Sequence, residues 1–299
     1  MNSSLYEIET WIDASLTADL PYADYWNDEK REAEKGHLHI TRLEDRDRVD
    51  AYLARTGIMG DLAACLTRCP PRGVGADLAA GICWPAPQIL AHPQVERLYC
   101  VEYSRHRLTT SAPIYLASHQ VDPDWVRLAL GSFYDIQLPD QSLDFIVLAA
   151  SFHHADDPDR LLGEVRRLLK TDGWVILIGE PVVRFSERLL TYYGRLILGN
   201  VLPVGMQRHL FGKTVRIPPR WIPGRTDVLA PDPLLGDHWY PLADYWKMFK
   251  NNGFTVAHFR SRGSPHRCFL LRVGEEGDRS GWGMPGDFGS GRRPNRHRA

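Results

Sequence analysis

Hydrophobic positions in the middle of the chain alternate between short β-rich runs and helical stretches. The runs cover residues 73–78, 98–101, 126–130, 143–148 and 174–178. Residues 159–170 are the clearest predicted helix, because their leucines and a valine recur on one side of it. Strands that alternate with helices predict βαβ units. We therefore expect an α/β fold with a doubly wound, mostly parallel sheet, covered by helices on both faces.

The pattern differs on either side of this core. Residues 1–69 predict a helical N-terminal extension, because apolar residues recur there at spacings of three and four between charges. Residues 183–239 contain six prolines, which predicts an insertion without long regular elements. The α/β pattern resumes over 240–273 with a helix at 242–251, and two closely linked strands, 254–259 and 268–273, that we expect to be antiparallel neighbours. From residue 274 the chain is rich in Gly and Arg, which predicts a disordered tail.

Composition excludes several classes of protein. The 299 residues are 43% hydrophobic and carry a net charge of −1, which favours a globular protein over one that coats nucleic acid. Five cysteines without a CxxC pair argue against a disulfide framework or a zinc ribbon. The longest apolar stretch, 189–206, contains Arg195 and a proline, so it is a poor membrane span. The start lacks the features of a secretory signal, and a cytoplasmic location is the default expectation.

Two acidic residues end neighbouring predicted strands. Asp77 begins a run of small residues that reaches Gly81, and Glu102 closes the strand that follows. Small side chains allow backbone N–H groups to approach a ligand, and an acid about 20 residues past such a turn is placed to accept the hydroxyls of a ribose. Small residues also pack purely structural turns. The two features in register favour a nucleotide-type binding site.

A longer series of motifs resembles the class I S-adenosylmethionine-dependent methyltransferases, and within them the small-molecule family of the "type 11" kind. The motifs are DLAAG (77–81), VEYS (101–104), LGSFYD (130–135), HHADDP (153–158) and LLGEVRRLLKTDGW (161–174). The resemblance covers roughly residues 70–182 and 240–273, and it implies a Rossmann-like sheet of seven strands. It also implies S-adenosyl-L-methionine as cofactor and S-adenosyl-L-homocysteine as product.

The resemblance assigns residues to each part of the cofactor. Asp77, Ala79 and Gly81 would hold the methionine end, and Glu102 would accept the ribose hydroxyls. Tyr103, Ser132 and Phe133 would line the adenine. Ala149, Ala150 and Ser151 would border the sulfonium. Two positions depart from the family pattern. Ala79 replaces a glycine and is accommodated if its φ is negative. Ser132 stands where aspartate is common, and Asp135 is the alternative partner of the adenine amine.

Other cofactors fit the residues less well. The chain has no GxxxxGK[ST] loop for a nucleoside triphosphate, and its turn after residue 77 is not the GxGxxG turn of NAD-dependent oxidoreductases. His153, His154, Asp156 and Asp157 are metal-ligand types, but they also suit a turn into the next helix that Asp157 caps. The resemblance supports the turn, and we expect no metal. His154 is a candidate general base and an equally good structural histidine. His238 is the other candidate for taking the acceptor's proton, and His238 and Tyr240 are candidate substrate-facing groups.

The remaining segments leave alternatives open. The insertion holds eight basic against four acidic residues, a net of +4, and can be a substrate lid, a solvated charged excursion or an amphipathic surface for lipid. Tyr22, Tyr25, Trp26 and His37 can cover the cofactor or pin a helix to the core.

We expect methyl transfer to a small-molecule nucleophile, preferably a hydroxyl of a sugar-like or anionic metabolite. The alternatives are a methyltransferase for protein or nucleic acid and a non-catalytic cofactor-binding scaffold. No nucleic-acid partner is expected, and a homodimer is left open.

Overall fold

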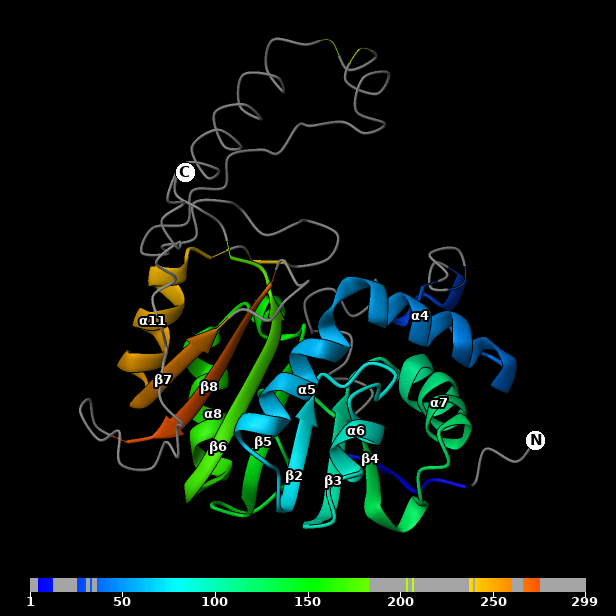
Figure 1. Ribbon diagram of the computed structural model, residues 1–299, viewed down its shortest axis with the longest axis horizontal. Helices are drawn as coiled ribbons and strands as arrows, with labels where there is room; N and C mark the ends of the chain where they lie inside the picture. The colour runs from blue at the N-terminus through cyan, green and yellow to red at the C-terminus, as the bar shows by residue number, and fades with distance from the viewer. Residues whose placement is uncertain are drawn as a thin grey trace, which may run out of the picture.

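A computed structural model describes residues 5–12, 26–30, 33, 37–182, 203, 206, 237–238, 240–259 and 266–274. Eight strands form one sheet in the order β1-β4-β3-β2-β5-β6-β8-β7 (Figure 1). Their bounds are Ile8–Thr10 (β1), Gly73–Leu78 (β2), Val95–Glu102 (β3), Val126–Leu130 (β4), Leu143–Ala149 (β5), Leu169–Glu180 (β6), Phe254–Phe259 (β7) and Arg267–Val273 (β8). The expected α/β class is confirmed.

The order of the strands reverses at β2. From β2 the chain first adds β3 and β4 on one side, and then adds β5 and β6 on the other. The pairs among β1 to β6 are parallel, and only β8 runs antiparallel, between β6 and β7. In open sheets of this kind, ligands bind beyond the carboxyl ends of the strands at the point of reversal. The ends of β2, β3 and β5 are therefore the place to look for a site.

Helices cover both faces of the sheet and bury two apolar layers. On one face α4 (Arg46–Thr56), α5 (Ile58–Arg68), α6 (Ala86–Leu90) and α7 (Ala112–Ser118) pack with Val147 and Ile176. On the other, α8 (Pro158–Leu168) and α11 (Leu242–Asn251) pack with Ile146 and Val175 (Figure 1). Adjacent residues of β5 and β6 thus face opposite layers, as a strand that is buried on both sides requires. No helix in the described ranges is long and apolar enough to cross a bilayer.

The structure differs from the sequence prediction in two respects. The sheet has eight strands instead of seven, because β1 lies in the region predicted as helical and pairs in parallel with β4. The predicted helix over 159–170 starts at Pro158 and ends at Leu168, because β6 begins at the next residue. The helix 242–251 and the antiparallel pair of closing strands are confirmed. The predicted tail beyond residue 274 and nearly all of the insertion fall outside the described residues.

Gly75 allows β2 and β5 to approach each other. It is the register partner of Phe145, and a Cβ at Gly75 would lie 2.1 Å from the Cζ of that ring. Gly75→Ala is expected to lower the free energy of unfolding by about 1–3 kcal/mol, because the buried ring must shift. Gly163→Ala, at an exposed helical position with no atom within 4 Å of the new Cβ, is the control and should stabilise by about 0.5–1 kcal/mol. Equal urea midpoints for the two variants would contradict this account.

Candidate functional site

Glu102 ties the end of β3 to the loop that follows β2. The side chain is almost fully buried, and its Oε2 accepts a hydrogen bond from the Gly81 backbone N–H at 2.7 Å. Its Oε1 accepts from the Ser104 N–H, also at 2.7 Å. Two backbone donors fix the orientation of the carboxylate, and each of its oxygens retains a second lone pair. The arrangement suits a fixed acceptor for two ligand hydroxyls.

Asp77, near the end of β2, is buried and has no hydrogen-bond partner among the residues that the structure describes. Its side chain is fully buried, and neither carboxylate oxygen accepts a hydrogen bond within the described residues. Burial, and secondarily the nearby Glu102, raises the pKa of Asp77 well above its usual value. A buried polar group without a partner is costly, and its persistence requires an explanation. A ligand that brings an ammonium group to Asp77 supplies one, so the residues present fit the amino-acid end of S-adenosylmethionine.

Several residues beside these acids have left-handed backbones. Ala79, Gly81 and Cys83 have φ of 56°, 58° and 61°, and Ala150, beyond β5, has φ of 54°. The condition under which Ala79 would replace glycine without strain, a negative φ, is therefore not met. A non-glycine residue in this region costs about 1–2 kcal/mol, and such strain tends to gather at functional sites. A Cβ added at Gly81 would have Nη1 of Arg107 as its nearest neighbour, 3.9 Å away, which leaves room for a ligand over the turn.

The loop after β4 carries the residues predicted to lie along the adenine. Ser132 and Phe133 are nearly buried, and Ser132 Oγ accepts a hydrogen bond from the Tyr134 N–H at 3.2 Å. Asp135 is exposed, and its Oδ1 accepts from Gln137 Nε2 at 3.0 Å. Each side chain thus has one hydrogen bond, and Ser132 is the more buried of the two candidates.

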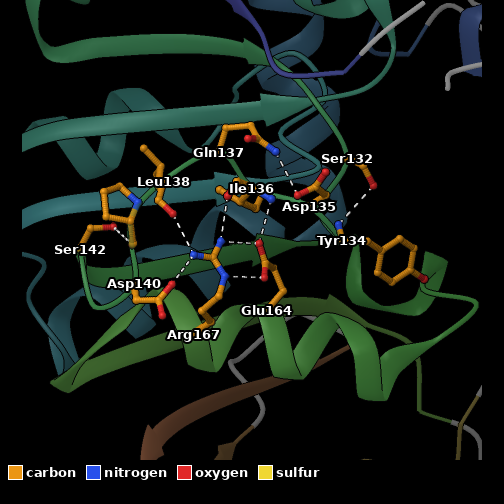
Figure 2. Close-up of polar contacts among 11 residues, drawn as sticks. Ser132, Tyr134, Asp135, Ile136, Gln137, Leu138, Asp140, Ser142, Glu164 and Arg167 are labelled. Atoms are coloured by element: carbon orange, nitrogen blue, oxygen red, sulfur yellow. Dashed lines mark hydrogen bonds and ion pairs between the residues drawn. The ribbon is translucent and has the colours of Figure 1, made fainter. Parts of the chain in front are cut away.

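Arg167 of α8 fastens this loop, as Figure 2 shows. Its guanidinium donates to the backbone oxygens of Ile136 and Leu138 at 2.8 and 2.9 Å, and to Asp140 Oδ1 at 2.7 Å. It also forms a two-point ion pair with Glu164, whose Oε1 accepts from the Ile136 N–H at 2.8 Å. The Glu164–Arg167 clamp therefore fixes the backbone directly after the predicted adenine-binding residues.

The residues predicted to border the sulfonium lie at the same edge of the sheet. Ala149 ends β5 and is nearly buried, and Ser151 Oγ donates to the Leu78 backbone oxygen at 3.1 Å. This bond joins the ends of β5 and β2. The predicted site residues on β2, β3, β4 and β5 thus share one edge, as parallel strands require.

Beyond β5 and β6 lies a cluster of three histidines, each beside a carboxyl group. The pairs are His153 Nδ1 with Glu180 Oε2 at 3.1 Å, His154 Nδ1 with Asp237 Oδ1 at 3.0 Å, and His238 Nε2 with Asp156 Oδ1 at 2.9 Å. The cluster lies next to the predicted sulfonium side of the site, because η4 (Phe152–His154) directly follows Ser151. Imidazoles paired with carboxyl groups are chemically suited to proton transfer.

The environments of His153 and His154 shift their pKa values in opposite directions. Burial tends to lower the pKa of His153, but the charge and hydrogen bond of Glu180 outweigh it, and the pKa is raised. Burial dominates at His154, whose pKa is lowered despite Asp237. Glu180 is fully buried and also accepts from the Phe152 N–H and the Tyr245 hydroxyl, each at 3.2 Å.

The predicted residues in the closing segment are buried. His238 has no exposed surface, and its backbone N–H donates to the His153 backbone oxygen at 2.7 Å. Tyr240 is also buried and stacks on His238, with ring centroids 5.9 Å apart. Both residues support the cluster from behind.

Sequence reasoning did not single out Glu180 or the pairing of Asp237 with His154. Glu180 carries the same signal as Glu102, an acid at the end of a buried strand, and could have been found. The contact of Asp237 joins two segments far apart in the chain, and no local pattern announces it.

Trp26 contacts both sides of the site. The Arg107 guanidinium lies 4.6 Å from the centre of its ring, and the His154 ring meets it edge-on at 5.2 Å. Its backbone oxygen accepts from Ser104 Oγ at 2.7 Å. These contacts favour the cofactor-covering alternative for Trp26. His37 instead stacks on Tyr52 of α4, as expected of a residue that pins a helix, while Tyr22 and Tyr25 fall outside the described residues.

A metal could also use part of the cluster. Donor atoms of His153, His154 and Asp237 all lie within 4.8 Å of one another. Two imidazoles and a carboxylate suit zinc or iron. Nδ1 of each histidine already faces a carboxylate, however, and the absence of a resident metal stays a prediction.

Comparison with known proteins agrees with this geometry. Residues 76–177 match the family model described as "Methyltransferase domain". Residues 76–177 therefore form a methyltransferase domain. The matched segment starts one residue before Asp77 and ends within β6, so it contains the strand ends described above. The match supports S-adenosylmethionine as the cofactor. No curated protein matches the chain.

Solved structures share the fold at low identity. The Burkholderia thailandensis 1,6-didemethyltoxoflavin-N1-methyltransferase, with its substrate and S-adenosylhomocysteine bound, is 14% identical, with a TM-score of 0.55 over 86% of this chain and 91% of that one. The mitomycin 7-O-methyltransferase is 14% identical, with a TM-score of 0.55 over 85% and 61% of the two chains. A chain from a Haloferax volcanii complex of a methyltransferase activator and a methyltransferase is 15% identical, with a TM-score of 0.52 over 84% of this chain and 97% of that one.

Proposed function

We propose that this protein transfers the methyl group of S-adenosylmethionine to a hydroxyl of a small molecule. The observation that carries the proposal is the pair of buried acids at the ends of β2 and β3. Glu102 is fixed by two backbone donors, and Asp77 has no partner within the described chain. Together they match the ribose hydroxyls and the ammonium group of this cofactor.

The predicted binding residues then have separate tasks. Asp77 accepts from the ammonium group, and Glu102 accepts from both ribose hydroxyls. Ser132, Phe133 and Tyr103 line the adenine. Ala149, Ala150 and Ser151 border the sulfonium, where small side chains leave space for the acceptor to approach the methyl group. Ala79 and Gly81 shape the turn that brings backbone N–H groups toward the methionine end.

The protein contributes to the chemistry mainly by placing the acceptor. The cofactor supplies an electrophilic methyl carbon, and holding the nucleophile in line with it yields most of the rate enhancement. His154 takes the proton of the hydroxyl, because its lowered pKa keeps the imidazole neutral near pH 7. His238, the other predicted catalytic residue, has no exposed surface and positions the cluster instead.

A small acceptor is preferred to a macromolecule. Two of the structures with the same fold are named for small acceptors, a mitomycin and a didemethyltoxoflavin. The near-neutral net charge offers no general attraction for nucleic acid.

Calorimetric titration with S-adenosylhomocysteine tests the cofactor site. Glu102→Ala is expected to weaken binding by about 100-fold or more, because it removes two hydrogen bonds to a charged group. Glu96→Ala, at an exposed position on the same strand, is the matched control and should bind as the wild type does. If the wild type does not bind, or if Glu102→Ala binds equally well while remaining folded, the proposed function is wrong.

A further inference from the structure

His153 and His154 are adjacent but are held by different elements. The ring of His153 is held from behind by Glu180 at the end of β6, and the ring of His154 by Asp237. Their centroids lie 4.3 Å apart. A hydrogen bond to Glu180 orients the His153 ring through Nδ1, whereas Nδ1 of His154 faces the Asp237 carboxylate at 3.0 Å in an ion-pair contact.

The second nitrogen of each ring is accessible. The side chains of His153 and His154 keep 11% and 23% of their surface exposed. The Nε2 atom of each ring is not fully buried, and it forms no hydrogen bond within the described chain. The two partly exposed rings thus lie 4.3 Å apart in η4, which directly follows Ser151, a residue predicted to border the sulfonium.

The two rings favour different protonation states. Glu180 accepts from His153 and favours its charged form, whereas burial favours the neutral form of His154. Neighbouring groups whose environments separate their pKa values commonly divide the roles of donor and acceptor. A charged His153 donates from Nε2, and a neutral His154 with its proton on Nδ1 accepts at Nε2.

Within the part of the chain that the structure describes, the charges around the pair favour a neutral acceptor. The cluster contains three carboxyl groups (Glu180, Asp237 and Asp156) against three imidazoles, and the Tyr245 and Tyr240 hydroxyls add no charge at neutral pH. With the pKa of His154 lowered and that of Asp237 also lowered, the ionised cluster is at most neutral. An anionic substrate gains no attraction here, whereas a positive sulfonium is tolerated.

We propose that His153 and His154 form hydrogen bonds with two oxygens on neighbouring carbons of a neutral, sugar-like acceptor. His154 contacts the oxygen to be methylated, and His153 contacts the oxygen on the next carbon. This rests on the proposed function and narrows its substrate class to vicinal diols. As the acceptor oxygen bonds to the methyl carbon, the carbon–sulfur bond breaks, and its electron pair goes to sulfur. The hydroxyl proton goes to His154 Nε2, while His153 donates a hydrogen bond and keeps its proton.

Nitrogen NMR of the full chain labelled in its histidines tests the protonation states directly. Long-range ¹H–¹⁵N spectra, assigned with His153→Gln and His154→Gln, should show His154 neutral at pH 7 with its proton on Nδ1. His153 should titrate at higher pH than His154. Glu180→Gln should lower the pKa of His153, which it contacts directly, more than that of His154; Tyr245→Phe, which keeps the Glu180 carboxyl, should preserve the order. Titration of both rings at the same pH would overturn the division of roles.

Methyl transfer to paired acceptors tests the substrate class. The panel consists of methyl glycosides of glucose, galactose and mannose, their monodeoxy forms and their uronic acids, with radiolabelled S-adenosylmethionine as donor. We expect turnover of a neutral glycoside, and a fall in kcat/KM of at least about 10-fold when the hydroxyl beside the methylated one is removed. His153→Gln should abolish this discrimination, whereas His154→Gln should lower kcat at pH 7.

The other outcomes overturn the proposal. They are turnover of the uronic acids alone, turnover of no glycoside, or discrimination that survives His153→Gln. One zinc per purified chain that is lost in His153→Gln would assign the rings to a metal instead. Binding of S-adenosylhomocysteine, measured in the same preparations, separates these failures from failure of the proposed function, because the histidine variants should leave it unchanged.

Discussion

Asp77→Asn is expected to abolish cofactor binding while stabilising the free protein. The native carboxyl is fully buried without a hydrogen-bond partner among the described residues, and an asparagine there removes its charge at nearly the same size. The loss of the ammonium partner should weaken binding of S-adenosylhomocysteine by about 100-fold or more. In the free protein, the cost of burying the ionised group disappears, and the expected gain is about 1–3 kcal/mol near pH 8.

The stabilisation should depend on pH in a defined direction. The pKa of Asp77 is raised in the folded protein, so folding favours the protonated form. The free energy of unfolding of the wild type therefore falls as pH rises from the usual pKa of an aspartate toward the raised one. Urea unfolding between pH 5 and 8 should show the difference between Asp77→Asn and wild type growing with pH. Asp124→Asn, at an exposed position, should show a constant difference.

Cofactor binding should also release a proton from Asp77. An ammonium group beside the carboxylate lowers its pKa, so affinity rises with pH up to the raised value in the free protein. Calorimetry in two buffers of different ionisation enthalpy measures the number of protons released. If no proton is released between pH 5 and 8, and if Asp77→Asn binds normally, Asp77 does not meet the ammonium group.

The central strands could be predicted because each has a local sequence pattern of its own. Runs such as 73–78 and 126–130 are apolar, short and bounded by turn residues, and the structure has strands with these same bounds. β1 was missed because Ile8–Thr10 has only three residues and no apolar run of its own. It is a strand because it pairs with β4, more than a hundred residues away. Secondary structure set by a distant partner leaves no local signal.

The site divides in the same way. Asp77 and Glu102 follow strands, so their meeting at one edge follows from a parallel sheet. The partner of His153, Glu180, lies 27 residues away, and the bond required knowledge of how β6 lies beside β5. The positive φ of Ala79 could not be predicted from its residue type, because the Cβ of alanine disfavours that conformation. The surrounding turn enforces it.

Arg167→Met is expected to lower the free energy of unfolding substantially, although the side chain lies near the surface. The Arg167 side chain is only 32% exposed, and its guanidinium donates to two backbone oxygens and two carboxylates at 2.7–2.9 Å. Methionine retains the apolar stem but leaves Glu164 and the loop oxygens without these donors. A loss of about 2–3 kcal/mol in the free energy of unfolding follows from the removal of several charge-assisted bonds, discounted for partial exposure.

Arg167→Met should also weaken cofactor binding, which a purely structural ion pair on α8 would not do. The clamp fixes Ile136 and Leu138 directly after the residues that line the adenine, so its loss frees that loop, and ordering it again costs binding free energy. Arg166→Met is the control, because the neighbouring guanidinium donates to the Asn252 oxygen, away from the loop. Arg167→Lys should rescue little, since a single ammonium cannot reproduce the planar fork. Urea unfolding and calorimetry on the three variants decide the matter: equal midpoints and affinities for Arg166→Met and Arg167→Met would show that the clamp does not hold the adenine side of the site.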